Sequence, residues 1–209
     1  MDRIWIIDTE GNGAQPCEII EVAMVEMVDL RLTGRACRQR FRPKNPVTWH
    51  AKQVHGISNK DLEGCRPIED YLGSIRKLIT DEPIAGHAVH VELGLLSSCM
   101  EDWSPRLAYD TLRMVRRAYP DLERHKLHII GEHMGLTAKA GQITRGKPHS
   151  AYYDAVLAGL VIETLTAPLG VEERLDLLAH AEVMEQRRRN AQKAAQKAQK
   201  AQMRRRVRA

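Results

Sequence analysis

The chain has 209 residues, of which 43% are hydrophobic, and this is enough for one α/β domain with a sizeable core and an appendage. No stretch contains the ~18 to 20 apolar residues that a membrane-spanning helix needs, and the four scattered cysteines form no CxxC pair that would suggest a zinc cluster or a disulfide framework. The formal charge of +5 is uneven, because residues 183–209 contain ten basic residues and one acidic residue, whereas residues 1–182 are net acidic. The N-terminal residues lack signal-peptide features, so we expect a cytoplasmic protein.

The first 41 residues predict three β-strands. Apolar residues at positions 4–7 precede Asp8 and Glu10, and residues 18–29 form a second, β-branched run. We expect a turn near Leu32 to Gly34 and a third strand that ends at Phe41. Short links between consecutive strands favour an antiparallel meander.

The rest of the chain predicts short strands that alternate with helices. Helices are expected at 67–80, around Val91 to Leu96, and at 111–117, 126–134 and 149–165, with short strands at 84–85 and ending at 109–111. This order predicts an α/β fold, a mixed sheet with three antiparallel strands and then parallel strands, flanked by helices. From Val171 we expect an uninterrupted helix, which divides the chain into a domain of residues 1–170 and a basic helical tail of residues 171–209.

Asp8 and Glu10 form a candidate metal site at the end of the first strand. Residues i and i+2 of a strand point to one face, so both carboxylates project together, roughly 7 Å apart at Cα. Like charges this close repel each other, and a hard cation such as Mg²⁺ or Mn²⁺ between them would remove that cost. The alternative is a strand that runs into an acidic turn at residues 11–13.

Two later segments contain polar residues in apolar or helical surroundings. Glu92 lies among Val91, Leu93 and Leu95, and His149 precedes Asp154 by five positions at the start of a predicted helix. Each signal is weak by itself, because helical acids and single histidines are usually solvated or structural.

In this order, the segments IIDTEG, VHGIS, AGHAVHVELGLL and HSAYYDA resemble the motifs of the DEDDh (DnaQ-like) 3′-to-5′ exonucleases. The resemblance covers about residues 3–166, and the overall size is most similar to that of exonuclease X. It implies a ribonuclease-H-like mixed sheet. The middle segment departs from the family pattern, because it has Ala88 and Glu92 where the family has Asn and Asp.

The resemblance also implies a chemistry, which is two-metal-ion hydrolysis of a phosphodiester with two Mg²⁺ or Mn²⁺ per active site. Asp8, Glu10, Glu92 and Asp154 would be the metal ligands, and His149 would accept a proton from the attacking water. Thr9, Gly11, His55 and Ile57 would hold the terminal nucleotide. The expected partner is a nucleic acid with a free 3′ end, with single-stranded DNA favoured.

Other functions stay open at this point. The departures at Ala88 and Glu92 would fit a catalytically weakened nucleic-acid-binding module. An exoribonuclease is a further alternative to the favoured exodeoxyribonuclease, because no feature of the sequence indicates how the chain would recognise the 2′-hydroxyl. A zinc site would have to use the clustered histidines, which are His87, His90, His125, His128 and His133. The basic tail would bind a phosphate backbone or an acidic partner, or it is a solvated helix. The oligomeric state is open.

Overall fold

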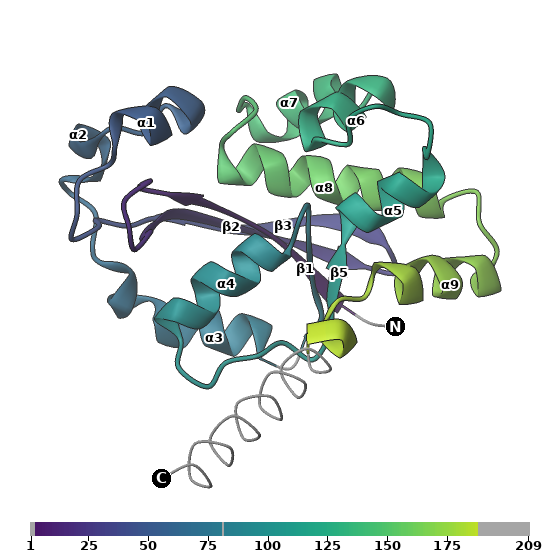
Figure 1. The fold of residues 1–209 in the computed structure, drawn as a ribbon, viewed down its shortest axis with the longest axis horizontal. Coiled ribbons are helices and arrows are strands. Elements are labelled where there is room, and N and C mark those ends of the chain that lie inside the picture. The colour runs from purple at the N-terminus through teal and green to yellow at the C-terminus, as the bar shows by residue number, and fades with distance from the viewer. Residues whose placement is uncertain (1–2, 81, 188–209) are drawn as a thin grey trace, which may run out of the picture.

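The computed structural model describes residues 3–80 and 82–187, and a five-stranded mixed sheet forms its centre (Figure 1). The strand order is β3-β2-β1-β4-β5. β1 (Arg3–Gly11), β2 (Ile19–Val28) and β3 (Arg31–Arg40) are antiparallel neighbours, whereas β4 (Ile84–Gly86) runs parallel to β1, and β5 (Ala108–Asp110) runs parallel to β4. This arrangement confirms the predicted mixed α/β sheet.

Helices cover both faces of the sheet (Figure 1). α8 (Ala151–Thr166) crosses β1, β2 and β3 on one face, together with α5 (Thr111–Ala118), α6 (Leu127–His133) and α7 (Thr137–Thr144). α3 (Leu72–Ile79) and α4 (His90–Cys99) cover the other face. The remaining helices are α1 (Trp49–His55), α2 (Asn59–Leu62), the 3₁₀ helix η1 (Ile68–Asp70) and α9 (Val171–Ala181). No helix of the described residues is long and apolar enough to cross a membrane.

The side chains of β1 explain these two layers. Ile4 and Ile6 belong to the core cluster that contains the buried face of α8, whereas Trp5 and Ile7 belong to the cluster that contains α3 and α4. Side chains alternate between the faces of a strand, so the central strand is buried on both sides. By the same alternation, Asp8 and Glu10 lie on the α8 face.

The hairpin between β2 and β3 differs from the prediction. Val28 pairs with Arg31, so the turn is Asp29–Leu30, with φ values of 55° and 60°, and the predicted turn at Leu32 to Gly34 is wrong. Positive φ at both central residues is the geometry of a two-residue hairpin turn. Gly34, with φ of 84°, lies instead where the register between β2 and β3 shifts. A glycine at a bulge was therefore mistaken for a glycine in a turn.

The C-terminal helix is also shorter than predicted. α9 ends at Ala181, Glu182 forms an isolated antiparallel bridge with Tyr109, and Val183 and Met184 are buried. The expected uninterrupted helix from Val171 is therefore wrong at Glu182, because this segment pairs with β5 before it continues. Residues 188–209, which hold most of the predicted basic tail, lie outside the described residues. The boundary at residue 170 stays a prediction.

Candidate active site

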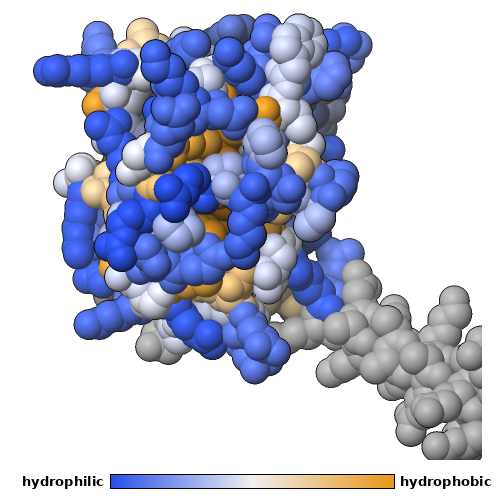
Figure 2. All heavy atoms as spheres, turned by 90° about the vertical axis from the view of Figure 1, so that its left-hand side faces the viewer, coloured by the Kyte–Doolittle hydropathy of each residue, from blue (hydrophilic) through white to orange (hydrophobic). Residues whose placement is uncertain are grey.

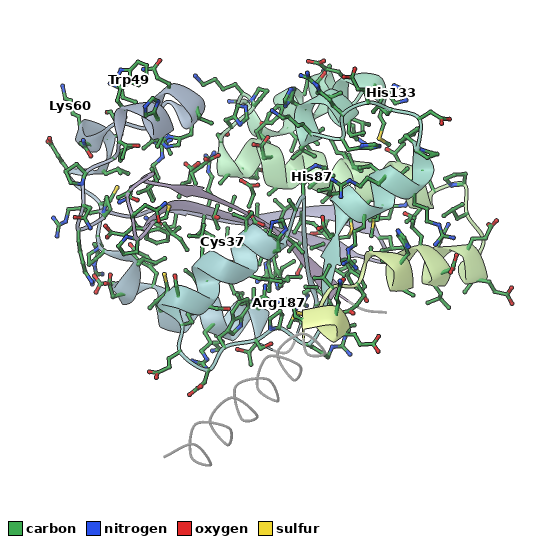
Figure 3. The ribbon with its side chains drawn as sticks, viewed as in Figure 1. Cys37, Trp49, Lys60, His87, His133 and Arg187 are labelled. Atoms are coloured by element: carbon green, nitrogen blue, oxygen red, sulfur yellow. The ribbon has the colours of Figure 1, made fainter. Side chains whose placement is uncertain are left out.

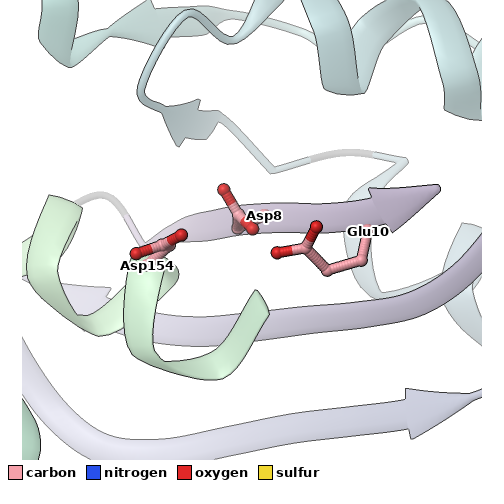
Figure 4. Close-up of side chains that lie close together, drawn as sticks. All are labelled: Asp8, Glu10 and Asp154. Atoms are coloured by element: carbon pink, nitrogen blue, oxygen red, sulfur yellow. The ribbon is translucent and has the colours of Figure 1, made fainter. Parts of the chain in front are cut away.

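Three carboxylates converge where β1 meets the start of α8 (Figure 4). One carboxylate oxygen from each of Asp8, Glu10 and Asp154 lies within 4.8 Å of the others. Asp8 and Glu10 come from β1, and Asp154 comes from the first turn of α8. The structure therefore brings together three of the four predicted metal ligands.

Burial and mutual repulsion make these carboxylates hard to ionise together. Burial, followed by the charges of Glu92 and Asp154, raises the pKa of Asp8 well above its usual value. Burial and the charges of Asp154 and Glu21 raise the pKa of Glu10 to about 8, and burial raises the pKa of Asp154 to about 6. A divalent cation relieves this repulsion, and an all-oxygen donor set suits Mg²⁺ or Mn²⁺. The three side chains thus fit the implied metal.

Glu92 approaches the cluster from a different element, the helix α4. The residue is 4% exposed, and its Oε2 has no hydrogen-bond partner within the described part of the chain. Burial, followed by the charges of Asp110 and Glu10, raises its pKa to about 8. Among the charged neighbours that raise the pKa of Asp8, Glu92 has the largest effect. Glu92 therefore lies close enough to couple with Asp8, although it is outside the group of three.

The segment between β4 and α4 is held by hydrogen bonds to the buried carboxylate of Asp110 and from the half-buried ring of His87. Ala88 has a left-handed φ of 61° and donates its N–H to Asp110 Oδ1 at 2.8 Å. Asp110 Oδ1 also accepts the N–H of Leu112, at 2.9 Å, and so begins α5. The backbone that precedes Glu92 is therefore tied to the end of β5.

His87, which is labelled in Figure 3, anchors the same segment through both of its ring nitrogens. Its Nδ1 lies 2.9 Å from Thr111 Oγ1, and its Nε2 lies 2.8 Å from the carbonyl oxygen of His125. The Nε2 of His125 in turn lies 2.8 Å from the carbonyl oxygen of Tyr119. These contacts engage both ring nitrogens of His87 and one of His125 with oxygen atoms, and within the described residues the histidines form no group of three that could hold a metal ion.

His149 stands beside the cluster at the edge of a cleft. The residue is exposed, with φ of 62°, and its backbone N–H donates to Asp154 Oδ2 at 3.1 Å. Its ring centroid lies 6.1 Å from that of His128. A cleft of about 520 Å³ is bordered by His149 and Asp154 and by three basic residues, which are Arg116, Arg124 and Lys126. One carboxylate of the cluster, Asp154, therefore lines this basic cleft.

The predicted nucleotide-binding residues lie near the cluster but have other contacts. The Thr9 side chain points to the opposite face of β1, and its Oγ1 is buried without a partner in the described residues. A Cβ at Gly11 would lie 2.5 Å from Cys17 Sγ, so a larger residue there would displace that thiol. His55 is buried, and its Nδ1 accepts the N–H of Ile57 at 3.0 Å. The sequence-based role of these residues stays a prediction.

Two further residues that position the site escaped the sequence analysis. Asn12 is fully buried: its Oδ1 accepts the N–H of Glu18 at 2.9 Å, and its carbonyl accepts the N–H of Thr48 at 2.8 Å, which ties the end of β1 to α1. Glu21 Oε2 accepts the N–H of Ala151 at 3.0 Å and fixes the start of α8 over β2. The sequence indicates these two positions only weakly: Asn12 is a polar residue between two glycines, and Glu21 is an acid within an apolar strand.

Residues 5–161 match the protein family described as Exonuclease. The chain belongs to this exonuclease family. It is 26% identical over 166 residues to the 3′-5′ exonuclease DinG of Bacillus subtilis, an alignment that covers 76% of this chain and 17% of that protein. The chain spans less than a fifth of the length of the curated relatives that it matches.

Solved structures of exonucleases share the fold. Exonuclease X in complex with 5′ overhanging duplex DNA superposes with a TM-score of 0.60 and 21% identity, covering 85% of this chain and 99% of that one. Escherichia coli exonuclease I in complex with a dT13 oligonucleotide gives a TM-score of 0.63 and 14% identity, covering 79% and 41%. These similarities confirm the exonuclease fold.

Proposed function

We propose that this chain is a metal-dependent 3′-to-5′ exonuclease that removes nucleotides from the 3′ ends of DNA. The observation that carries the proposal is the convergence of Asp8, Glu10 and Asp154, with His149 hydrogen-bonded through its backbone to the third carboxylate. Family membership supports the reaction class. The DNA in the exonuclease X and exonuclease I structures supports the choice of substrate.

Asp8, Glu10 and Asp154 would hold one Mg²⁺ or Mn²⁺, and Asp8 and Glu92 would hold the second. When bound, such cations supply positive charge to the attacking and leaving oxygens of a phosphodiester displacement. His149 would accept the proton that the attacking water loses, because its side chain is exposed at the edge of the cleft. Without positive charge between them, the deprotonated carboxylates would repel one another.

The substrate would enter through the basic cleft. Arg116, Arg124 and Lys126 would contact phosphate groups, which positions a strand without reading its sequence. Backbone groups at Thr9 and Gly11, with His55 and Ile57, would hold the terminal nucleotide. The basic residues of the predicted tail would add contacts to the phosphate backbone.

The test uses oligonucleotides of DNA and RNA labelled at either end, incubated with Mg²⁺, Mn²⁺ or EDTA. A 5′ label should yield a ladder of shortened DNA, and a 3′ label should be released as a mononucleotide. EDTA and the variant Asp154→Asn should both stop cleavage. Faster hydrolysis of RNA than of DNA would show that RNA is the substrate. Binding without any cleavage would contradict the proposed enzymatic activity.

A further inference from the structure

A second basic groove borders the loop before α8, which also contributes Pro148 and His149 to the basic cleft. Its volume is about 370 Å³, and it lies between the corner that joins α1 to α2 and the loop that joins α7 to α8, with β2 and β3 beneath. The basic residues that line it are Arg38, Arg40, Arg145 and Lys147. This side of the molecule is covered largely by hydrophilic residues, with hydrophobic ones visible in hollows (Figure 2). We call it the β3 groove.

The register of the sheet places this groove next to the carboxylate cluster. Residues paired across adjacent strands point to the same face. The two relevant rows are Asp8, Ala23 and Arg38, and Glu10, Glu21 and Arg40. A pair of carboxylates on β1 and a pair of guanidinium groups on β3 therefore share one face, two strand spacings or roughly 10 Å apart.

The positive charge of the β3 groove is only partly neutralised. Arg40 Nε donates to Glu21 Oε1 at 2.9 Å, and the guanidinium of Arg38 lies 5.1 Å from the ring centroid of Tyr152. Within residues 3–80 and 82–187, Arg38, Arg145 and Lys147 make no ion pair. The second acid of the groove, Asp61, accepts hydrogen bonds from the N–H and the hydroxyl of Ser58.

Lys147 extends across the groove toward the segment with His55 and Ile57, which are predicted to hold the terminal nucleotide. Its Nζ lies 3.5 Å from the position that a Cβ on Gly56 would take, between His55 and Ile57. The loop that carries Arg145 and Lys147 leads directly to His149 and α8. The groove and the cluster therefore lie on the same face of the antiparallel part of the sheet, and both border the start of α8.

We propose that the β3 groove binds a backbone phosphate of the nucleic acid, away from the bond that is cleaved. This inference rests on the proposed function. A guanidinium group presents parallel N–H donors that match two phosphate oxygens, and a lysine adds a mobile charge. Such a contact holds the strand without sequence preference and makes binding sensitive to salt. The phosphate belongs either to the cleaved strand or to its complement.

The test compares the double variant Arg145→Gln/Lys147→Gln with the control Arg31→Gln/Lys77→Gln. The control removes the same charge from exposed residues that line neither the cleft nor the β3 groove. Every protein also carries Asp154→Asn, so that DNA is not consumed, and binding is measured by fluorescence anisotropy over a range of salt concentrations. The substrates are a single strand and a duplex with a recessed 3′ end.

We expect the groove variant to bind about tenfold more weakly at low salt and to lose about 1.4 from its log–log salt slope on single strands, at ~0.7 for each lost contact. A change on both substrates assigns the phosphate to the cleaved strand, and a change on the duplex alone assigns it to the complement. Unchanged affinity and slope on both would overturn the inference. An Arg38→Gln variant provides an independent repeat.

A second measurement separates this inference from the proposed function. The 4-nitrophenyl ester of thymidine 5′-phosphate has no second phosphate group, so its hydrolysis reports on the carboxylate cluster alone. In proteins with Asp154 intact, the ratio of kcat/KM on DNA to that on the ester should fall about tenfold in the groove variant and stay constant in the control. If the unmodified protein hydrolyses neither substrate with Mn²⁺, the proposed function itself fails.

Discussion

Glu92 is one methylene longer than the Asp that the resemblance leads one to expect, and it lies outside the group of three carboxylates. We expect this longer side chain to hold the second cation loosely, so the enzyme should prefer Mn²⁺ to Mg²⁺, which demands a near-ideal octahedron. Glu92→Ala should remove most activity, whereas Glu92→Asp should cost little or improve cleavage with Mg²⁺. Metal titrations of cleavage rate check this, and identical curves for the unmodified protein and Glu92→Ala would make Glu92 a bystander.

His149 has an exposed side chain, and its backbone N–H donates to Asp154 Oδ2. His149→Ala should slow cleavage by about 10²- to 10⁴-fold, the range that follows from loss of a general base. His133→Ala on α6 is the control, since that ring packs on Tyr119 and lies outside the cleft. Both variants are compared at saturating Mn²⁺ above pH 8, where Glu10 and Asp154 have lost their protons, so the fall in cleavage rate should be confined to His149→Ala. Equal rates in the two variants would show that another group takes the proton.

Ala88 adopts a left-handed backbone conformation that costs an L-residue roughly 1–2 kcal/mol. Ala88→Gly should therefore raise the free energy of unfolding by about 1 kcal/mol, and Ala88→Asn should also be tolerated, because Asn enters this region readily. Ala140→Gly, within α7, is the control and should lower stability by about 1 kcal/mol or more. Urea denaturation measures the free energy of unfolding of each variant. If Ala88→Gly lowers stability as Ala140→Gly does, residue 88 is not left-handed in solution.

The segment that follows α9 shows where the C-terminal end of the chain can be truncated. Val183 and Met184 are buried and Glu182 pairs with Tyr109, so a cut after Arg187 leaves the packed body intact. Removing residues 188–209 removes nine basic residues and no acidic ones. We expect weaker binding of long DNA and a smaller salt slope, by ~0.7 for each lost single-strand contact. Turnover of very short oligonucleotides should not change. An unaltered salt slope would mean that the tail does not bind nucleic acid.

The elements that the sequence predicted well are those with a strong apolar pattern. β1 and β2 are buried along most of their length, and Asp8 and Glu10 stand out at the end of such a strand. α1 and α7 were not predicted, because they bury few side chains and lack apolar periodicity. Periodicity also says nothing about distant partners, so the proximity of Asp154 to Asp8 came only from the resemblance. Asn12 and Glu21 were missed because hydrogen bonds to distant backbone groups leave no local pattern.

For the whole molecule, the carboxylate cluster predicts an unusual pH dependence of stability. Glu10 and Glu92 have pKa values of about 8 in the fold against a usual 4.5, and Asp154 has about 6 against 3.8. The folded chain thus binds more protons than the unfolded chain, so without metal the free energy of unfolding should fall as pH rises from about 4.5 to about 8.

Thermal unfolding in EDTA from pH 5 to pH 9 measures this effect. Mn²⁺ should raise Tm most at the alkaline end, where the carboxylates have lost their protons and the cation replaces them. The double variant Glu10→Gln/Asp154→Asn should show a flatter pH dependence and a smaller response to Mn²⁺. A Tm in EDTA that rises across this range would contradict the assigned electrostatics.

Asp8 and Asp154 come from opposite ends of the segment that matches the exonuclease family, and α8 reaches β1 only after every strand of the sheet has been made. Synthesis runs from the N-terminus to the C-terminus, so β1 is made long before α8. While the ribosome is still producing this chain, the first strand therefore holds two acids without their third partner. A polypeptide that is released before α8 is made therefore lacks the third carboxylate, and with it the complete cluster.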